Sequence, residues 1–132
     1  MSKQFKNVKP GDKIYKVCAY NYKTRIITKK VKEVYGKYVE DGCKVRILCA
    51  CIDSEYYQNL FNSIAGDSSI HKDKFAPNTY ICTNIEDAKI VCKNLANEII
   101  SKAEKEMEKL SNRVDKWRSH MEELSDDNYI IV

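Results

Sequence analysis

Apolar residues recur along three short segments in the first half of the chain, residues 13–20, 25–35 and 43–52. In the third segment, residues 43, 45, 47, 49 and 51 are apolar and fall at alternate positions. These segments are rich in β-branched and aromatic side chains, which favour strands. Gly36 is expected to end the second strand, and residues 37–40 are expected to form a further short strand. Asp41-Gly42 after it has the sequence of a tight hairpin turn. Short strands joined by such turns predict an α+β fold that begins with a small, bent antiparallel sheet or an SH3-like barrel.

The next segment, residues 54–65, has apolar side chains three or four residues apart. This spacing predicts a short helix, which Gly66 can end. Residues 67–79 are polar and predict a loop, and residues 80–82 predict a last strand. Residues 1–82 are therefore expected to form one basic, barrel-like domain.

The second half of the chain predicts one long amphipathic helix over residues 83–124. Thr83 and Glu86 have the spacing of a capping box at its start, and no Gly or Pro follows them. The apolar residues recur about every 3.5 residues, which is the period of a coiled coil. Up to residue 100 they form a broad face that can pack on a sheet, and beyond it they form a single row.

The single apolar row is flanked by charged residues, which is the pattern that another helix covers. A second copy of the chain is the simplest partner, because two-fold dimers are the commonest oligomers. A hairpin folded back at Ser111-Asn112 and a foreign partner are the alternatives. The expected helix-pairing residues are Met107, Leu110, Val114, Trp117, Met121 and Leu124.

Residues 125–132 form a C-terminal tail in which an acidic lead precedes four apolar residues, Tyr129 to Val132. Three interpretations stay open for this tail: a frayed end, a strand added to the edge of the sheet, or a peptide offered to a partner's groove. The four apolar residues are poorly suited to water, so the frayed end is favoured only slightly.

The net charge of +4 hides an asymmetry between the two halves of the chain. Residues 1–50 hold thirteen Lys and Arg against four Asp and Glu, and residues 51–132 hold ten against fifteen. Basic side chains interleaved with aromatic ones suit a polyanion, and they are equally typical of strands with a solvated face. The candidate partner- or nucleic-acid-binding residues are Lys23, Arg25, Lys29, Lys30, Lys32, Tyr20, Tyr22 and Tyr35.

The six cysteines are interpreted as buried thiols rather than as a disulfide framework. Cys43, Cys49 and Cys51 fall at alternate positions of one predicted strand, so they share its expected buried face. A zinc site at Cys49 and Cys51 with His71 or His120 is the alternative. It is disfavoured because the pair is C-x-C and not a C-x-x-C knuckle, so no metal or cofactor is expected.

The motifs that would indicate catalysis are missing from the sequence, which has no nucleophile elbow, phosphate-binding loop or HExxH. No apolar run approaches the ~20 residues of a membrane span, and the first residues lack the apolar core of a secretory signal. The chain is therefore expected to be a cytoplasmic protein that is neither an enzyme nor bound to a membrane.

Two motifs carry a resemblance to known proteins. Gly11 opens the pattern G-D-x-[IV]-Y-x-[IV] in "GDKIYKV", and Thr83 opens T-x-x-[ED]-x-A in "TNIEDA". With them the chain resembles small, uncharacterised phage and prophage accessory proteins in which an SH3-like barrel leads into a helix, although the likeness does not extend to residues 101–132. The resemblance implies a factor that acts in the host cytoplasm by binding, such as an inhibitor of a defence system, and it brings no catalytic residues.

Two functions of different classes are thus predicted. The favoured one is stoichiometric binding to a macromolecular partner such as a host protein complex, because it uses both the charge asymmetry and the long helix. The alternative is direct binding of nucleic acid by the basic barrel, with an affinity that falls steeply as salt rises.

Overall fold

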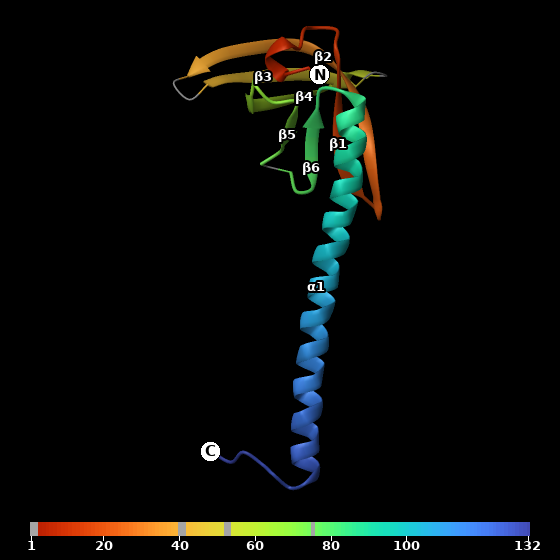
Figure 1. Ribbon diagram of the computed structural model, residues 1–132, viewed down its shortest axis with the longest axis vertical. Helices are drawn as coiled ribbons and strands as arrows, with labels where there is room; N and C mark the ends of the chain where they lie inside the picture. The colour runs from red at the N-terminus through yellow and green to blue at the C-terminus, as the bar shows by residue number, and fades with distance from the viewer. Residues whose placement is uncertain (1–2, 40–41, 52–53, 75) are drawn as a thin grey trace. The chain divides into compact units, whose positions relative to one another are not determined.

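The computed structural model describes residues 3–39, 42–51, 54–74 and 76–132. Within these ranges it confirms the predicted α+β class, because a nearly closed, barrel-like antiparallel sheet of six strands leads into one long helix (Figure 1). The strand order is β4-β3-β2-β1-β6-β5. The elements are a 3₁₀ helix (Phe5–Asn7), β1 (Lys13–Tyr20), β2 (Lys23–Val39), β3 (Gly42–Cys51), β4 (Ser54–Ala65), β5 (Ile70–Lys72), β6 (Thr79–Cys82) and α1 (Ile85–Ser125).

β1 and β2 form a hairpin with a two-residue turn. Asn21 and Tyr22 both adopt a positive φ, 52° and 63°, which is the turn backbone that matches the twist of paired strands. Tyr20 pairs with Lys23 across the turn, so the tip of the hairpin carries side chains from both strands. β1 has the bounds predicted from the β-branched and aromatic residues of segment 13–20.

β2 includes both predicted strands, because it continues without a break through Gly36 to Val39. Gly36 pairs with Val45 of β3, and the ladder on either side offsets the modest cost of a glycine in a strand. The register shifts between Val31 and Glu33 instead, and such a bulge bends a strand. The predicted turn residue Asp41 lies outside the described residues.

The short helix predicted over residues 54–65 is wrong, because this segment forms β4. Phe61 pairs with Ile47 and Ile64 pairs with Val45, so β4 advances by three residues while β3 advances by two. Ser63 lies in this bulge with a φ of 56°. Because of the bulge, Phe61 and Ile64 face the same core although they are three residues apart. This is the i, i+3 spacing that is typical of a helix.

The predicted loop at residues 67–79 contains β5, whose three residues are too few to show a period in the sequence. His71 of β5 lies opposite Ile81 of β6. β6 corresponds to the strand predicted at residues 80–82, and its other edge pairs with β1.

The main hydrophobic core lies on the inner face of the sheet and is closed by Phe5 and Val8, which are 0% and 4% exposed. The Phe5 N–H donates to the Ser68 carbonyl and the Lys6 N–H to the Gly66 carbonyl, each at 2.9 Å. Main-chain hydrogen bonds therefore fix this N-terminal segment to the turn after β4. The other core residues are Ile14, Val31, Val45, Ile47, Cys49, Phe61, Ile64 and Ile81.

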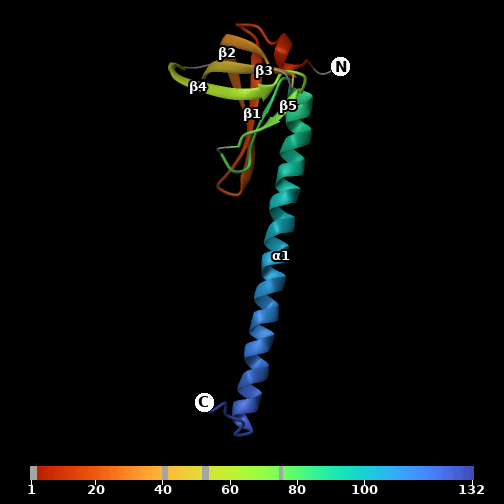
Figure 2. The same ribbon diagram turned by 90° about the vertical axis from the view of Figure 1, so that its left-hand side faces the viewer.

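The first turns of α1 lie against the barrel in both ribbon views (Figures 1 and 2). The Cys92 thiol donates a hydrogen bond to the Thr24 hydroxyl of β2 at 2.9 Å. Thr24 shares its face of the hairpin with Val17, which is fully buried outside the main core. The buried residues of the helix are Ala88, Val91 and Leu95.

The helix is capped one residue later than predicted. Asn84 Oδ1 accepts from the Asp87 N–H at 2.8 Å, and Asn84 Nδ2 donates to the Asp87 carboxylate at 2.7 Å. Thr83 is buried instead, and its hydroxyl donates to the Lys3 carbonyl oxygen. The predicted capping box of Thr83 and Glu86 is therefore wrong, because the N-terminal segment binds the threonine hydroxyl.

α1 runs without interruption from Ile85 to Ser125, which contradicts the alternative of a hairpin at Ser111-Asn112. The chain divides into two compact units, residues 1–96 and 97–132, so the first turns of the helix belong to the barrel unit. In the described part of the chain, no helix has both the length and the apolarity needed to cross a membrane.

Candidate functional site

The tip of the β1–β2 hairpin gathers four of the predicted binding residues. Tyr20 and Tyr22 are 66% and 105% exposed, and Lys23 and Arg25 are also exposed. The Arg25 guanidinium lies 5.1 Å from the centre of the Tyr20 ring, a cation–π contact that presents charge and ring together. This hairpin tip (residues 20–25) can place cations on phosphates or acidic side chains and an aromatic face on a base or an apolar group.

The other predicted binding residues do not join the hairpin tip. Lys30 and Lys32 are exposed farther along β2. Tyr35 donates a hydrogen bond to the Glu33 carboxylate, which raises the pKa of Tyr35. Tyr35 and Lys23 are about 40 Å apart along β2, given the usual rise per residue in a strand. The eight residues therefore do not make one patch.

Lys29 is a wrong prediction, because only 3% of it is exposed. It pairs with Ile14 in the β1–β2 ladder, and directly opposed residues share one face of a sheet. Ile14 belongs to the inner core, so Lys29 points to the inside of the barrel. The Lys29-Lys30 pair therefore divides between the two faces, and only Lys30 is available to a partner.

A cavity of about 460 Å³ lies between β4 and the β5 segment, the two edges of the sheet. Its lining combines the apolar side chains of Phe61 and Ile81 with polar ones. Burial lowers the pKa of His71, against the opposing effect of the nearby Asp73 charge. The polar residues of the lining are Lys16, Asn62, Ser63, His71, Asp73 and Lys74. This cavity has no signal in the sequence, because residues 54–65 predict a helix and residues 67–79 predict a loop at its walls.

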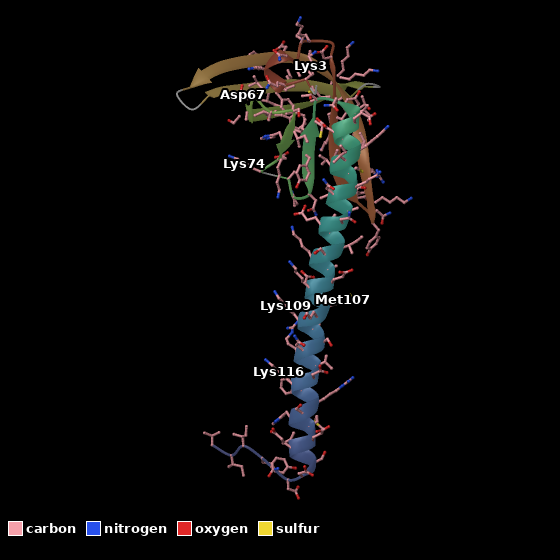
Figure 3. All side chains as sticks on the ribbon, in the orientation of Figure 1. Lys3, Asp67, Lys74, Met107, Lys109 and Lys116 are labelled. Atoms are coloured by element: carbon pink, nitrogen blue, oxygen red, sulfur yellow. The ribbon has the colours of Figure 1, made fainter. Side chains whose placement is uncertain are left out.

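The predicted helix-pairing row is exposed on α1. Met107, Leu110 and Val114 are 68%, 51% and 46% exposed, and Trp117 and Met121 are 70% and 58% exposed. Leu124, the last residue of the row, is partly buried. Figure 3 shows Met107 on one side of the helix and Lys109 and Lys116 on the other. The row is a continuous apolar seam of a size that soluble proteins usually cover.

The C-terminal tail forms no strand in the structure, and Tyr129 to Val132 are 60% to 117% exposed. The interpretation as an edge strand of this chain's own sheet is therefore wrong for the free chain. The other two interpretations, a frayed end and a peptide for a partner, stay predictions.

Four of the six cysteines have described side chains, and all four are free thiols: Cys18, Cys49, Cys82 and Cys92. Burial raises the pKa of Cys49 and of Cys82 to about 12. Thiols with such pKa values are protonated at neutral pH and are poor nucleophiles. Among the described residues no group of three or more potential ligands could hold a metal, and the Cys51 side chain lies outside them.

Alkylation is expected to spare Cys49 and Cys82 in the folded protein at pH 8. Both thiols are fully buried and lack the thiolate that attacks iodoacetamide. The pKa of each thiol in the folded protein lies above the unfolded value of about 8.5, so the unfolded chain loses these protons first as the pH rises. The free energy of unfolding is therefore expected to fall between about pH 9 and pH 12. Mass spectrometry after alkylation with and without denaturant checks this, and modification of either residue without denaturant would contradict it.

No protein-family model matches the chain, and neither the curated proteins nor the solved structures include a significant match. Three surfaces of the chain are therefore the candidates for its function. They are the hairpin tip, the cavity between the sheet edges and the Met107–Leu124 seam.

Proposed function

We propose that the chain is a non-catalytic accessory protein that acts by stoichiometric binding to a macromolecular partner. The exposed seam from Met107 to Leu124 is the observation that carries this proposal. Covering one side chain of this size contributes roughly 1.5–3 kcal/mol, so an uncovered row of them favours association. The resemblance to phage accessory proteins implies that the partner is a host or defence complex, which the protein would inhibit.

Each of the two units has its own role in this function. The seam joins two copies of the chain into a homodimer, and the hairpin tip of each barrel contacts the partner. Exposed cations beside exposed rings are common in protein interfaces, where Tyr and Arg contribute much of the binding energy. Tyr20, Tyr22 and Arg25 form such a group at the tip. The buried thiols Cys49 and Cys82 fit the reducing cytoplasm that this function requires.

A nuclease-treated host lysate tests the proposal with three forms of the immobilised protein. Wild type is expected to retain one protein partner in a fixed molar ratio. The variant Tyr22→Ser with Arg25→Ser is expected to lose this partner, because it removes the exposed ring and the cation at the hairpin tip. Lys105→Ala is the matched control on the exposed helix and should retain it. Equal retention by all three forms would overturn the role of the hairpin tip.

Direct nucleic-acid binding is the second candidate, favoured by the same hairpin tip with Lys30 and Lys32 beside it. Each phosphate contact adds about one unit to the slope of log affinity against log salt. Lys23→Ala with Arg25→Ala is therefore expected to weaken binding of mixed DNA and RNA and to reduce this slope by about two. Lys105→Ala serves as the control. A gel-shift salt series checks this, and no shift even at low salt would reject this candidate.

A further inference from the structure

The seam from Met107 to Leu124 is part of a longer heptad repeat that begins at Ala96. This repeat, Ala96 to Leu124, is called the heptad seam. In coiled-coil notation, the a and d positions face the partner helix and the e and g positions flank them. The a positions are Ile100, Met107, Val114 and Met121, and the d positions are Ala96, Ala103, Leu110, Trp117 and Leu124. Ala88, Val91 and Leu95, which pack on the barrel, lie about 90° around the helix from this repeat, so both faces can be covered at once.

We propose that this heptad seam pairs with the same seam of a second copy in antiparallel orientation, with Leu124 of one copy beside Ile100 of the other. The inference rests on the homodimer of the proposed function and adds the direction and register of the pairing. The charged residues that flank the heptad seam indicate the direction of the pairing, and the volumes of the core residues indicate its register.

A parallel pair would be unfavourable at its flanks. There each g residue faces the e residue five positions later on the other helix. Arg113 would face Arg118 of the second copy, and the symmetry of the dimer would repeat this repulsion. The remaining charged g residue, Glu106, would face the uncharged Ser111. Parallel pairing thus gains no ion pair and suffers two like-charge contacts.

In an antiparallel pair, the e residues of one helix face the e residues of the other, and the g residues face the g residues. In the proposed register Glu104 faces Arg118 of the second copy, and Glu106 faces His120 of the second copy, each twice. One like-charge contact remains, where Arg113 meets its own copy at the two-fold axis. All of these side chains except that of His120 are exposed on the free helix, so they are available to the second copy.

The core layers are complementary in size in the same register. Trp117 faces Met107, and Met121 faces the small Ala103. Leu110 faces Val114. Parallel pairing would instead stack Trp117 on Trp117 and leave a void between two copies of Ala103, which packs poorly.

The position of Leu124 distinguishes the proposed register from its neighbours. It faces Ile100 in the proposed register. A shift of one heptad toward the start of the helix would place it against Lys93, which would bury a charge beside a leucine. A shift in the other direction would place Glu104 beside the uncharged Ser125, which removes both ion pairs between Glu104 and Arg118.

Charge reversal at Arg118 tests the direction, with the dimer dissociation constant measured by sedimentation equilibrium at low salt. In the antiparallel pair Arg118→Glu replaces two ion pairs by two repulsions, so Kd is expected to rise about tenfold. The double variant Glu104→Arg with Arg118→Glu exchanges the charges and is expected to restore Kd to within about twofold. Lys105→Glu, at the outward f position, is the matched control and should leave Kd unchanged.

Each other outcome has its own meaning. A tighter dimer for Arg118→Glu would overturn the proposal in favour of parallel pairing, because it would relieve the contact between Arg113 and Arg118. An unchanged Kd would overturn the register. A wild-type protein that is monomeric at every concentration would reject the homodimer itself, and with it this inference, while leaving partner binding by the barrel to its own test.

Discussion

Replacing Leu110 or Trp117 with aspartate is expected to turn the proposed dimer into a folded monomer. Both side chains are exposed in the free chain, at 51% and 70%, and the homodimer would bury each of them twice. Burial of a side chain of this size contributes roughly 1.5–3 kcal/mol, so either variant is expected to raise Kd by at least about a hundredfold. The barrel should stay intact, because neither residue belongs to its unit.

Light scattering of the variants at tens of micromolar measures this effect, and circular dichroism checks that they are folded. Asn112→Asp is the matched control, because it adds the same charge to the outward f position of the same helix. It should remain a dimer. A monomeric wild-type protein under these conditions would contradict the prediction and would assign the seam to a foreign partner.

Phe5→Ala is expected to destabilise the barrel by about 3–5 kcal/mol, the usual cost of removing a buried phenylalanine. Phe5 is fully buried and packs in the main core with Val8. Main-chain hydrogen bonds hold the N-terminal segment in place, so the cavity left by the ring would be filled only in part. Urea unfolding followed by circular dichroism measures the change in the free energy of unfolding.

Lys6→Ala is the control for this prediction. Its backbone N–H still donates to the Gly66 carbonyl, and its side chain is exposed and paired only with Asp67. The control should change the free energy of unfolding by less than about 1 kcal/mol, because exposed ion pairs contribute little. A similarly small loss for Phe5→Ala would show that the N-terminal segment does not support the core in solution.

Most of the strands could be predicted from the sequence because their residues are β-branched or aromatic, and in β3 they also alternate regularly. Val45, Ile47 and Cys49 alternate without interruption, and all three are buried in β3. β4 could not be predicted, because its bulge between Phe61 and Ile64 replaces the period of two by a spacing of three. A short apolar run with that spacing looks the same in a helix and in a bulged strand.

Features that depend on contacts distant in sequence were also beyond prediction. Thr83 does not cap the helix, because its hydroxyl donates a hydrogen bond to the carbonyl oxygen of Lys3, eighty residues away. Lys29 is turned inward by the face that β2 presents to Ile14. The 3₁₀ segment at Phe5 has no periodic pattern of its own and becomes recognisable only as the residues that close the barrel.

The hairpin tip and the exposed seam were predictable for the opposite reason. Their residues are local in sequence, and local spacing is enough to place them on one turn or one helix face. The cavity between β4 and β5 needs two strands that the pattern did not reveal, so no local signal could have located it.

The uninterrupted course of α1 has a consequence for avidity. In the antiparallel pair proposed above, the two Ala96 residues lie about 48 Å apart along the helix axis, at the usual rise per residue. Each such dimer would therefore carry two identical barrels, one joined to each end of the paired helices. A target with two sites at a matching distance would be held far more tightly than a target with one, because the second contact forms at a high effective concentration. A partner that is itself a two-fold symmetric complex is the kind that this spacing would select.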